Sequence, residues 1–182
     1  MVKRWWSRLG GIYLDTKDLK FLKIAIKKHP KTDLTLEYLI KQDAIGALVL
    51  NKAGDKALLD KQYRPGADNE MYEIPAGLID PGEKPIDTLY RELSEETGYD
   101  PTDYDIIVDS PTPLYVSPGY TQEKIYIYVV QLKNDDIIPH SLRLDVGEDL
   151  SNHWFNLEDI EGCSQDMKTN FALYLYKIKA EK

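Results

Sequence analysis

Cysteine is almost absent from this sequence, because Cys163 is the one thiol among 182 residues. A single cysteine excludes an intramolecular disulfide and any zinc cluster built from several cysteines. Long apolar runs are also missing, and none approaches the roughly 20 residues that a membrane-spanning helix requires. The basic N-terminal residues are not followed by the apolar stretch of a secretory signal. These absences predict a globular protein of the cytoplasm without a membrane partner.

Positive charge is scarce overall, because 31 acidic residues outnumber 23 basic ones and leave a net charge of -8. This balance predicts no nucleic-acid partner, since a surface that binds nucleic acid needs an excess of positive charge. Residues 1–42 are the exception, with 10 basic and 4 acidic side chains, against 13 and 27 in the rest. This segment could bind an anionic ligand or an acidic surface, or its lysines could be solvated on exposed strands.

Signatures of several enzyme classes are missing as well. The sequence has no phosphate-binding P-loop, no GxGxxG dinucleotide motif and no nucleophile elbow. Its three histidines, His29, His140 and His153, are far apart in the sequence. Catalysis by a covalent nucleophile is therefore not indicated.

Hydrophobic periodicity predicts a mixture of strands and helices that suggests an α/β sandwich with a mixed sheet. Strands are predicted over 21–28, 34–40, 44–50, 56–63, 71–74, 106–115, 124–132 and 153–155. Helices are predicted over 85–97 and 166–179. Pro85 suits the first helical turn, where its missing N–H costs nothing, and Gly98 suits the position just past the helix end.

The helix predicted over 85–97 carries an unusual acidic group. At 100° per residue its apolar side chains form one stripe, and Glu92, Glu95 and Glu96 share a sector of roughly 100° on another face. Like charges at these spacings repel one another, and anions near a helix C-terminus oppose its dipole. Such local conflicts tend to mark functional sites, and a divalent cation that prefers oxygen ligands would relieve this one. The helix alone is also compatible with a solvated acidic surface carrying an Arg91–Glu95 ion pair.

The residues around this helix match a known pattern. From Gly77 the sequence runs through five residues to Glu83, seven more to Arg91-Glu92-Leu93, and then to Glu95-Glu96 and Gly98-Tyr99. This spacing resembles the Nudix box, G-x5-E-x7-R-E-U-x-E-E-x-G-U, where U is a bulky aliphatic residue. The one departure is Tyr99 at the last aliphatic position, and its ring is apolar enough to pack there.

The resemblance to the Nudix family implies a fold, a cofactor and a set of roles. The fold would be the Nudix α/β/α sandwich with a mixed sheet over residues 43–182, preceded by a short β extension over residues 1–42. The metal, Mg²⁺ or possibly Mn²⁺ in its place, would be held by Glu92, Glu95, Glu96 and the backbone carbonyl of Ala76, with Glu95 and Glu96 counted as catalytic. Structural support would come from Gly77, Glu83, Arg91 and Gly98, in which Glu83 pairs with Arg91.

Three other segments resemble the ADP-ribose pyrophosphatase branch of this family: Gln62–Pro65 with Glu73–Gly77, then Ser117–Glu123, then Glu148–His153. They imply that Glu148 is the general base, with Asp149 as the next candidate. Relatives exchange their N-terminal extension between the subunits of a homodimer, where it helps to hold the adenine. The substrate contacts implied by these resemblances are Arg64, Glu73, Leu78, Glu123, Glu37, Lys41 and Phe21. Arg64 has a planar fork that suits phosphate oxygens.

The sequence therefore predicts Mg²⁺-dependent hydrolysis of ADP-ribose to AMP and ribose 5-phosphate, or of a related nucleoside diphosphate sugar. Two alternatives stay open. One is hydrolysis of another diphosphate, such as ADP-glucose, a UDP-sugar or a dinucleotide. The other is a non-catalytic module that binds ADP-ribose as a sensor, which would be expected to have lost box carboxylates that this chain keeps.

Overall fold

A computed structural model describes residues 19, 22–144, 147 and 149–180 of the chain. These residues belong to two compact units. The smaller unit contains the residues up to Lys41 together with Tyr115–Glu123, and the larger one contains Gln42–Leu114 and the residues from Lys124 onward. Among the helices of the described residues, none combines the length and the apolar character needed to cross a membrane.

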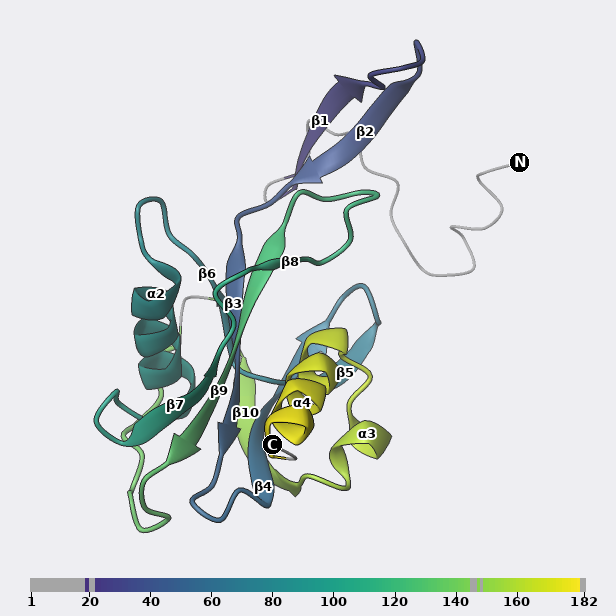
Figure 1. The fold of residues 1–182 in the computed structure, drawn as a ribbon. Coiled ribbons are helices and arrows are strands. Elements are labelled where there is room, and N and C mark those ends of the chain that lie inside the picture. Colours follow the sequence, from purple (N-terminus) through teal and green to yellow (C-terminus); the bar gives the residue numbers. More distant parts are fainter. Residues whose placement is uncertain (1–18, 20–21, 145–146, 148, 181–182) are drawn as a thin grey trace. The chain divides into compact units, whose positions relative to one another are not determined.

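The larger unit is built on a mixed sheet with the strand order β10-β4-β3-β9-β7 (Figure 1). The bounds of these strands are β3 (Ala44–Leu50), β4 (Lys56–Arg64), β7 (Tyr104–Asp109), β9 (Lys124–Leu132) and β10 (Leu150–Asn156). β3 and β9 run parallel, and the other neighbours along this path are antiparallel. Three short strands are added to it, since β5 (Asn69–Glu73) pairs with β4, β6 (Ala76–Leu78) pairs with β3, and β8 (Leu114–Tyr115) pairs with β9. The predicted mixed sheet is confirmed.

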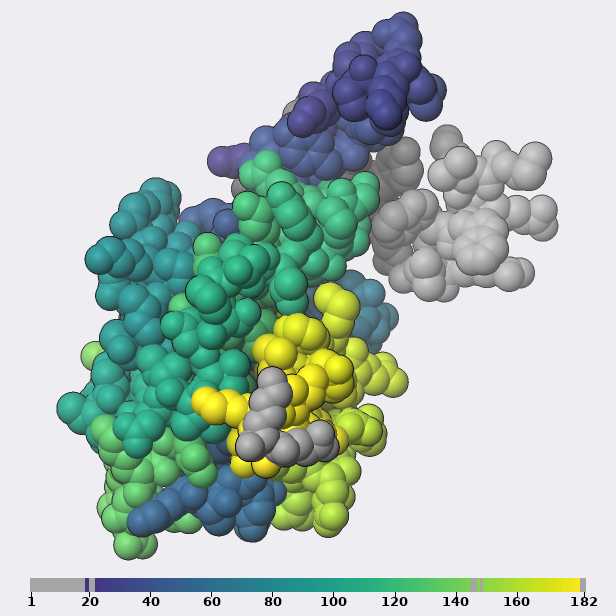
Figure 2. Space-filling model, viewed as in Figure 1, coloured from purple at the N-terminus to yellow at the C-terminus, as the bar shows by residue number. Residues whose placement is uncertain are grey.

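Helices cover both faces of this sheet. α2 (Pro85–Glu92) packs against β3, and α4 (Met167–Ala180) packs against β3 and β9. Figure 1 shows the two helices on opposite sides of the sheet, and the outer surface of α4 is visible in yellow in Figure 2. Because β3 lies between them in the middle of the sheet, all of its residues are buried, as its unbroken apolar sequence predicts.

The helix that carries the acidic group begins as predicted and ends differently. Pro85 lies in its first turn, and the buried side chains of Leu89 and Leu93 each stabilise the fold by roughly 2 kcal/mol. The prediction of a regular α-helix as far as Thr97 is wrong, because Leu93–Thr97 forms a π-helical turn, η2. Single π turns within helices occur frequently at functional sites, and the wider turn changes the angular spacing of the side chains on it. Gly98 then ends the helix with a left-handed φ of 76°.

Several strand boundaries also differ from the prediction. The strand expected over 106–115 is divided into β7 and β8 (Leu114–Tyr115), because Pro111 and Pro113 between them have no N–H to donate to a sheet. β6 and the four-residue helix α3 (Ile160–Cys163) are not predicted at all, since such short elements contain little more than one period, too few residues to show a repeating pattern. β10 begins three residues earlier than the strand predicted from His153.

The smaller unit is a β-hairpin with a neighbouring loop. β1 (Lys23–Lys28) pairs antiparallel with β2 (Thr35–Ile40), close to the predicted extents. Within this unit the N–H of Leu39 donates to the carbonyl of Tyr120 over 2.7 Å, which connects the loop to the hairpin. The apolar side chains of the hairpin are largely exposed, for example Ile26 at 68%.

Candidate active site

Glu92, at the end of α2, lies against the backbone of Gly77 in β6. A Cβ atom added at Gly77 would lie 1.8 Å from both Cδ and Oε1 of Glu92. The carboxylate therefore occupies the space that any larger residue at position 77 would fill. The glycine of the box is explained here by this close approach rather than by an unusual backbone conformation.

Glu96 meets the same short strand from the next turn of the helix. Its Oε2 accepts a hydrogen bond from the N–H of Ala76 over 3.0 Å, and the residue is only 7% exposed. A carboxylate that is buried to this extent needs polar or charged partners, because its desolvation is costly. The helix and the turn after it thus bring two carboxylates to Ala76 and Gly77, which precede the box helix in the sequence.

Arg91 connects the helix to the loop before it. Its Nη2 donates to Oε2 of Glu83 over 3.0 Å and to the carbonyl of Leu78 over 3.1 Å, while its Nη1 donates to Glu92 over 2.7 Å. Hydrogen bonds from Arg91 are the main cause that lowers the pKa of Glu83 to about 2. Glu83 is consequently a carboxylate throughout the physiological pH range.

Glu95 is the most exposed of the three helix carboxylates, with 35% of its side chain accessible and its Oε2 3.3 Å from Nη1 of Arg91. In the part of the chain that the structure describes, no three histidine, cysteine or carboxylate side chains are already grouped as a metal site. The ligand atoms at this place nevertheless suit a hard cation. The side chains of Glu92 and Glu96 both lie against the backbone of Ala76 and Gly77, so the possible ligands are carboxylate and carbonyl oxygens. A metal ion there would compete with Arg91 for Glu92 and Glu95.

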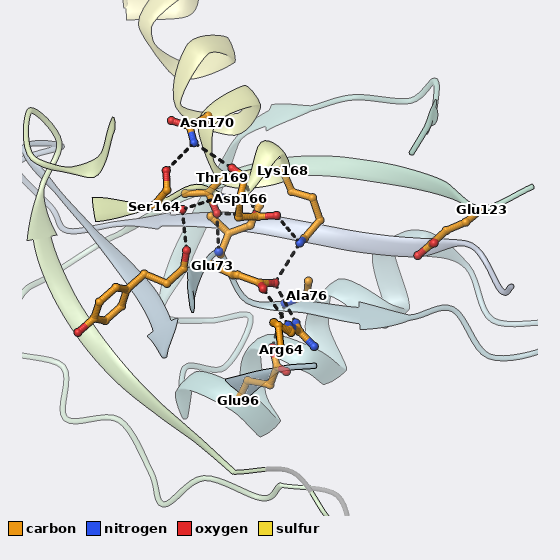
Figure 3. Close-up of polar contacts among 12 residues, drawn as sticks. Arg64, Glu73, Ala76, Glu96, Glu123, Ser164, Asp166, Lys168, Thr169 and Asn170 are labelled. Carbon is orange, nitrogen blue, oxygen red and sulfur yellow. Dashed lines mark hydrogen bonds and ion pairs between the residues drawn. The ribbon is translucent and has the colours of Figure 1, made fainter. Parts of the chain in front are cut away.

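Arg64, at the end of β4, forms a two-point ion pair with Glu73 of β5 (Figure 3). Its Nε and Nη2 donate to Oε1 and Oε2 of Glu73 over 2.8 and 2.9 Å. Burial by itself would raise the pKa of Glu73, but the hydrogen bonds from Arg64 and the charge of Lys168 outweigh it and lower this pKa. The charge of Arg64 also interacts with Glu96. Two predicted substrate residues are thus paired with each other and placed near the helix carboxylates.

The sequence did not indicate the part that the start of α4 plays at this site. Lys168 donates to Glu73 over 3.0 Å and to Asp166 over 2.7 Å. Thr169 accepts a hydrogen bond from the N–H of Ile74, the residue after Glu73, over 2.9 Å. The sequence does contain the pattern Asp166-x-x-Thr169, which predicts a cap at the start of this helix. It does not predict that the capped turn contacts the end of β5.

Asp60 is a buried carboxylate in β4 that no sequence pattern singled out. Its Oδ1 accepts a hydrogen bond from Asn152 of β10, and it lies opposite Glu73 of β5. Burial is the main cause that raises the pKa of Asp60 to about 7, and the nearby charge of Glu73 acts in the same direction.

Replacing Asp60 by Asn is expected to change how stability depends on pH. In the unfolded chain this carboxyl ionises near pH 4, and in the folded chain near pH 7, so the folded state binds more protons between these values. The free energy of unfolding of the natural chain therefore falls as the pH rises through this window. Asp60→Asn removes this loss. The difference in unfolding free energy between the variant and the natural chain should therefore shift in favour of the variant by up to roughly 4 kcal/mol between pH 4 and pH 8.

Urea denaturation of both proteins at pH 4, 6 and 8 tests this prediction. Asp105→Asn is the control, because the Asp105 side chain is 71% exposed. An Asp60→Asn effect that is the same at pH 4 and pH 8 would contradict the raised pKa.

The remaining predicted residues lie in several places. In the smaller unit, Lys41 and Glu123 form an ion pair with Nζ and Oε2 2.7 Å apart, and Glu37 is an exposed residue of β2 opposite Ile26. Leu78 is 45% exposed in β6. Two further predicted residues, the substrate contact Phe21 and the base Glu148, lie outside the described residues.

Comparison with known proteins places these features in a family. Residues 40–177 match the family model for the NUDIX domain. The ADP-ribose pyrophosphatase of Bacillus subtilis is 28% identical over 181 residues, which cover 95% of this chain and 88% of that protein. The ADP-ribose pyrophosphatase of Saccharomyces cerevisiae is 40% identical over 94 residues, covering 50% and 39%. The ADP compounds hydrolase NudE of Escherichia coli is 33% identical over 118 residues, covering 65% and 59%.

The family model covers more than half of the chain, and the chain therefore belongs to the Nudix family. The α/β/α arrangement and the box helix agree with this assignment, and Tyr99, the one departure in the box, is packed in the core with 6% exposure. The predictions of a Nudix fold and of a Nudix pyrophosphohydrolase are confirmed.

Proposed function

We propose that this protein hydrolyses the pyrophosphate bond of ADP-ribose, or of a related nucleoside diphosphate sugar, with bound Mg²⁺. The observation that supports this most is the convergence of Glu92 and Glu96 on the Ala76–Gly77 backbone, close to the guanidinium of Arg64. Carboxylates that hold cations and an arginine that holds phosphate are the groups that a diphosphate requires. The names of the Bacillus and yeast relatives favour ADP-ribose among the diphosphates.

The chemistry follows from the charge of the substrate. Both phosphates of a phosphoanhydride are anionic and repel a nucleophile. Mg²⁺, or Mn²⁺ in its place, would neutralise this charge and lower the pKa of a bound water when present. Glu92, Glu95 and Glu96 would hold the ions, together with the carbonyl of Ala76.

The chain itself would supply orientation and a proton acceptor. Arg64 uses Nε and Nη2 for Glu73, which leaves Nη1 to donate to a phosphate oxygen. Glu148 would take the proton of the attacking water, and Asp149 beside it is the next candidate. Such in-line attack needs no covalent nucleophile.

A substrate panel tests this proposal. Purified protein is incubated with ADP-ribose, ADP-glucose, UDP-glucose and FAD, with and without Mg²⁺, and the nucleotide products are separated by chromatography. We expect ADP-ribose to give AMP and ribose 5-phosphate fastest, and only with the metal. Faster turnover of another compound would reassign the substrate, and binding of ADP-ribose without turnover, in Mg²⁺ or Mn²⁺, would favour a sensor.

We also propose that the protein forms a homodimer through the β1–β2 hairpin, with Phe21, Glu37 and Lys41 contributing to substrate binding there. An isolated two-stranded hairpin is at best marginally stable in water. Its exposed apolar side chains, Ile24 and Ile26 on one face and Leu36 on the other, favour a covering partner.

Light scattering after gel filtration should give twice the chain mass for the natural protein and the single chain mass for Ile26→Lys. A natural protein that elutes with the single chain mass would contradict the dimer.

A further inference from the structure

Lys168 has no role in the reaction as proposed, yet it lies in the middle of a partly buried ionic cluster (Figure 3). Its Nζ is 3.0 Å from Oε2 of Glu73 and 2.7 Å from Oδ1 of Asp166. The same Oε2 of Glu73 accepts a hydrogen bond from Nη2 of Arg64 over 2.9 Å. One carboxylate oxygen is thus shared by two cations, one from α4 and one from β4.

The position of Lys168 is itself fixed by the start of α4. Oδ2 of Asp166 accepts hydrogen bonds from the N–H and the hydroxyl of Thr169, over 2.9 and 2.7 Å, and so caps the helix. The Thr169 hydroxyl also accepts from the N–H of Ile74 over 2.9 Å. The first turn of α4 therefore holds both the backbone at the end of β5 and the side chain of Glu73. Lys168 is 21% exposed, so its ammonium is placed by these contacts.

Lys168 supplies one of the two positive charges that face Glu73 and Asp166. Glu73 and Asp166 are 7% and 10% exposed and contribute two negative charges, which Arg64 and Lys168 neutralise. Removing one partner of a buried ion pair leaves an uncompensated charge, which is costly. Without Lys168, Arg64 would be the cation facing Glu73 and Asp166, two poorly solvated carboxylates, in addition to Glu96, with which it already interacts. The guanidinium would be drawn toward them, and the site would offer less positive charge to a diphosphate.

We infer that Lys168 is a positioning residue for substrate binding, which acts through Glu73 to keep Arg64 oriented toward the diphosphate. Lys168 does not contact the substrate in this arrangement. The inference rests on the proposed function, in which Arg64 binds the phosphates. It adds a group from the C-terminal helix, outside the Nudix box, to the determinants of substrate affinity.

A double-mutant cycle with ADP-ribose as substrate tests this inference. Lys168→Met should raise KM about 10-fold with kcat within about 3-fold, because pre-organised ground-state binding is lost. Lys168→Arg should keep KM within about 3-fold of the natural enzyme, since it restores the cation. Arg64→Ala should raise KM at least as much as Lys168→Met does. If Lys168 acts through Arg64, adding Lys168→Met to Arg64→Ala should raise KM by less than about 2-fold.

Lys177→Met is the matched control, because Lys177 lies on the same helix and pairs with the exposed Glu161; its KM should be unchanged. Melting temperatures of all variants show whether any loss reflects unfolding. An unchanged KM in Lys168→Met, or a full additional 10-fold increase in the Arg64→Ala background, would overturn the inference while leaving the proposed function intact. An unchanged KM in Arg64→Ala would overturn the role of Arg64 and this inference with it. Failure of the natural protein to hydrolyse ADP-ribose would overturn the proposed function itself.

Discussion

Replacing Glu96 by Gln is expected to lower turnover of ADP-ribose at least about 100-fold at saturating Mg²⁺, because a neutral amide is a poor ligand for a hard cation. The fold should be preserved. Glu96 accepts a hydrogen bond from the backbone N–H of Ala76, and the amide oxygen of Gln can accept the same bond. The substitution also removes a negative charge from a residue that is only 7% exposed, which lowers the cost of its burial.

Steady-state kinetics and thermal denaturation measure the two parts of this prediction. Glu161→Gln is the matched control, because the Glu161 carboxylate is 68% exposed and pairs with Lys177 on the surface. The control should retain the natural turnover and melting temperature. A Glu96→Gln enzyme with turnover close to that of the natural protein would mean that Glu96 is not a metal ligand.

Replacing Gly77 by Ala should also abolish most of the activity, for a steric reason. The added Cβ would lie 1.8 Å from the carboxylate carbon of Glu92 and 2.4 Å from its Cγ. The atoms that collide belong to the end of a flexible side chain, so Glu92 can move aside without disturbing the backbone. A catalytic group displaced by about 1 Å can cost roughly 100-fold in rate, and we expect a loss of this order with the fold intact.

The control for this experiment is Gly66→Ala, because a Cβ at Gly66 has no neighbouring atom within 4 Å among the described residues. Both variants should melt within a few degrees of the natural protein, and only Gly77→Ala should lose turnover. Full activity in Gly77→Ala would show that the position of Glu92 has no importance for catalysis. A large fall in its melting temperature would show that the backbone cannot accept the side chain, contrary to the contact described above.

The family and the acidic box could be predicted from sequence because they depend on short-range spacing. Residues three and four apart on an α-helix share a face, so a common sector for Glu92, Glu95 and Glu96 could be predicted without knowledge of the rest of the fold. The unbroken apolar sequence of β3 likewise predicts a strand covered on both sides. The π turn at Leu93–Thr97 escaped the prediction, because the choice between α and π spacing depends on what the turn packs against.

Contacts between distant segments were decided by the tertiary structure alone. Asp60 and Asn152 meet because β10 pairs with β4, and Lys168 reaches Glu73 because the start of α4 lies beside the end of β5. Neither pairing leaves a periodic signal, since the partners are separated by most of the domain. Strand order and helix docking set these distances, and no local pattern encodes them.

The amino-acid sequence by itself determined the reaction class, since the spacing of the box residues identifies the family. Only the tertiary structure decided how the box carboxylates and Arg64 are held. Glu92 fits against Gly77 because β6 packs against the helix, and Arg64 pairs with Glu73, which also accepts a hydrogen bond from Lys168 of the C-terminal helix. The physical reason is that a helix fixes neighbours within one turn, whereas the electrostatic balance of a buried cluster depends on every segment that packs around it.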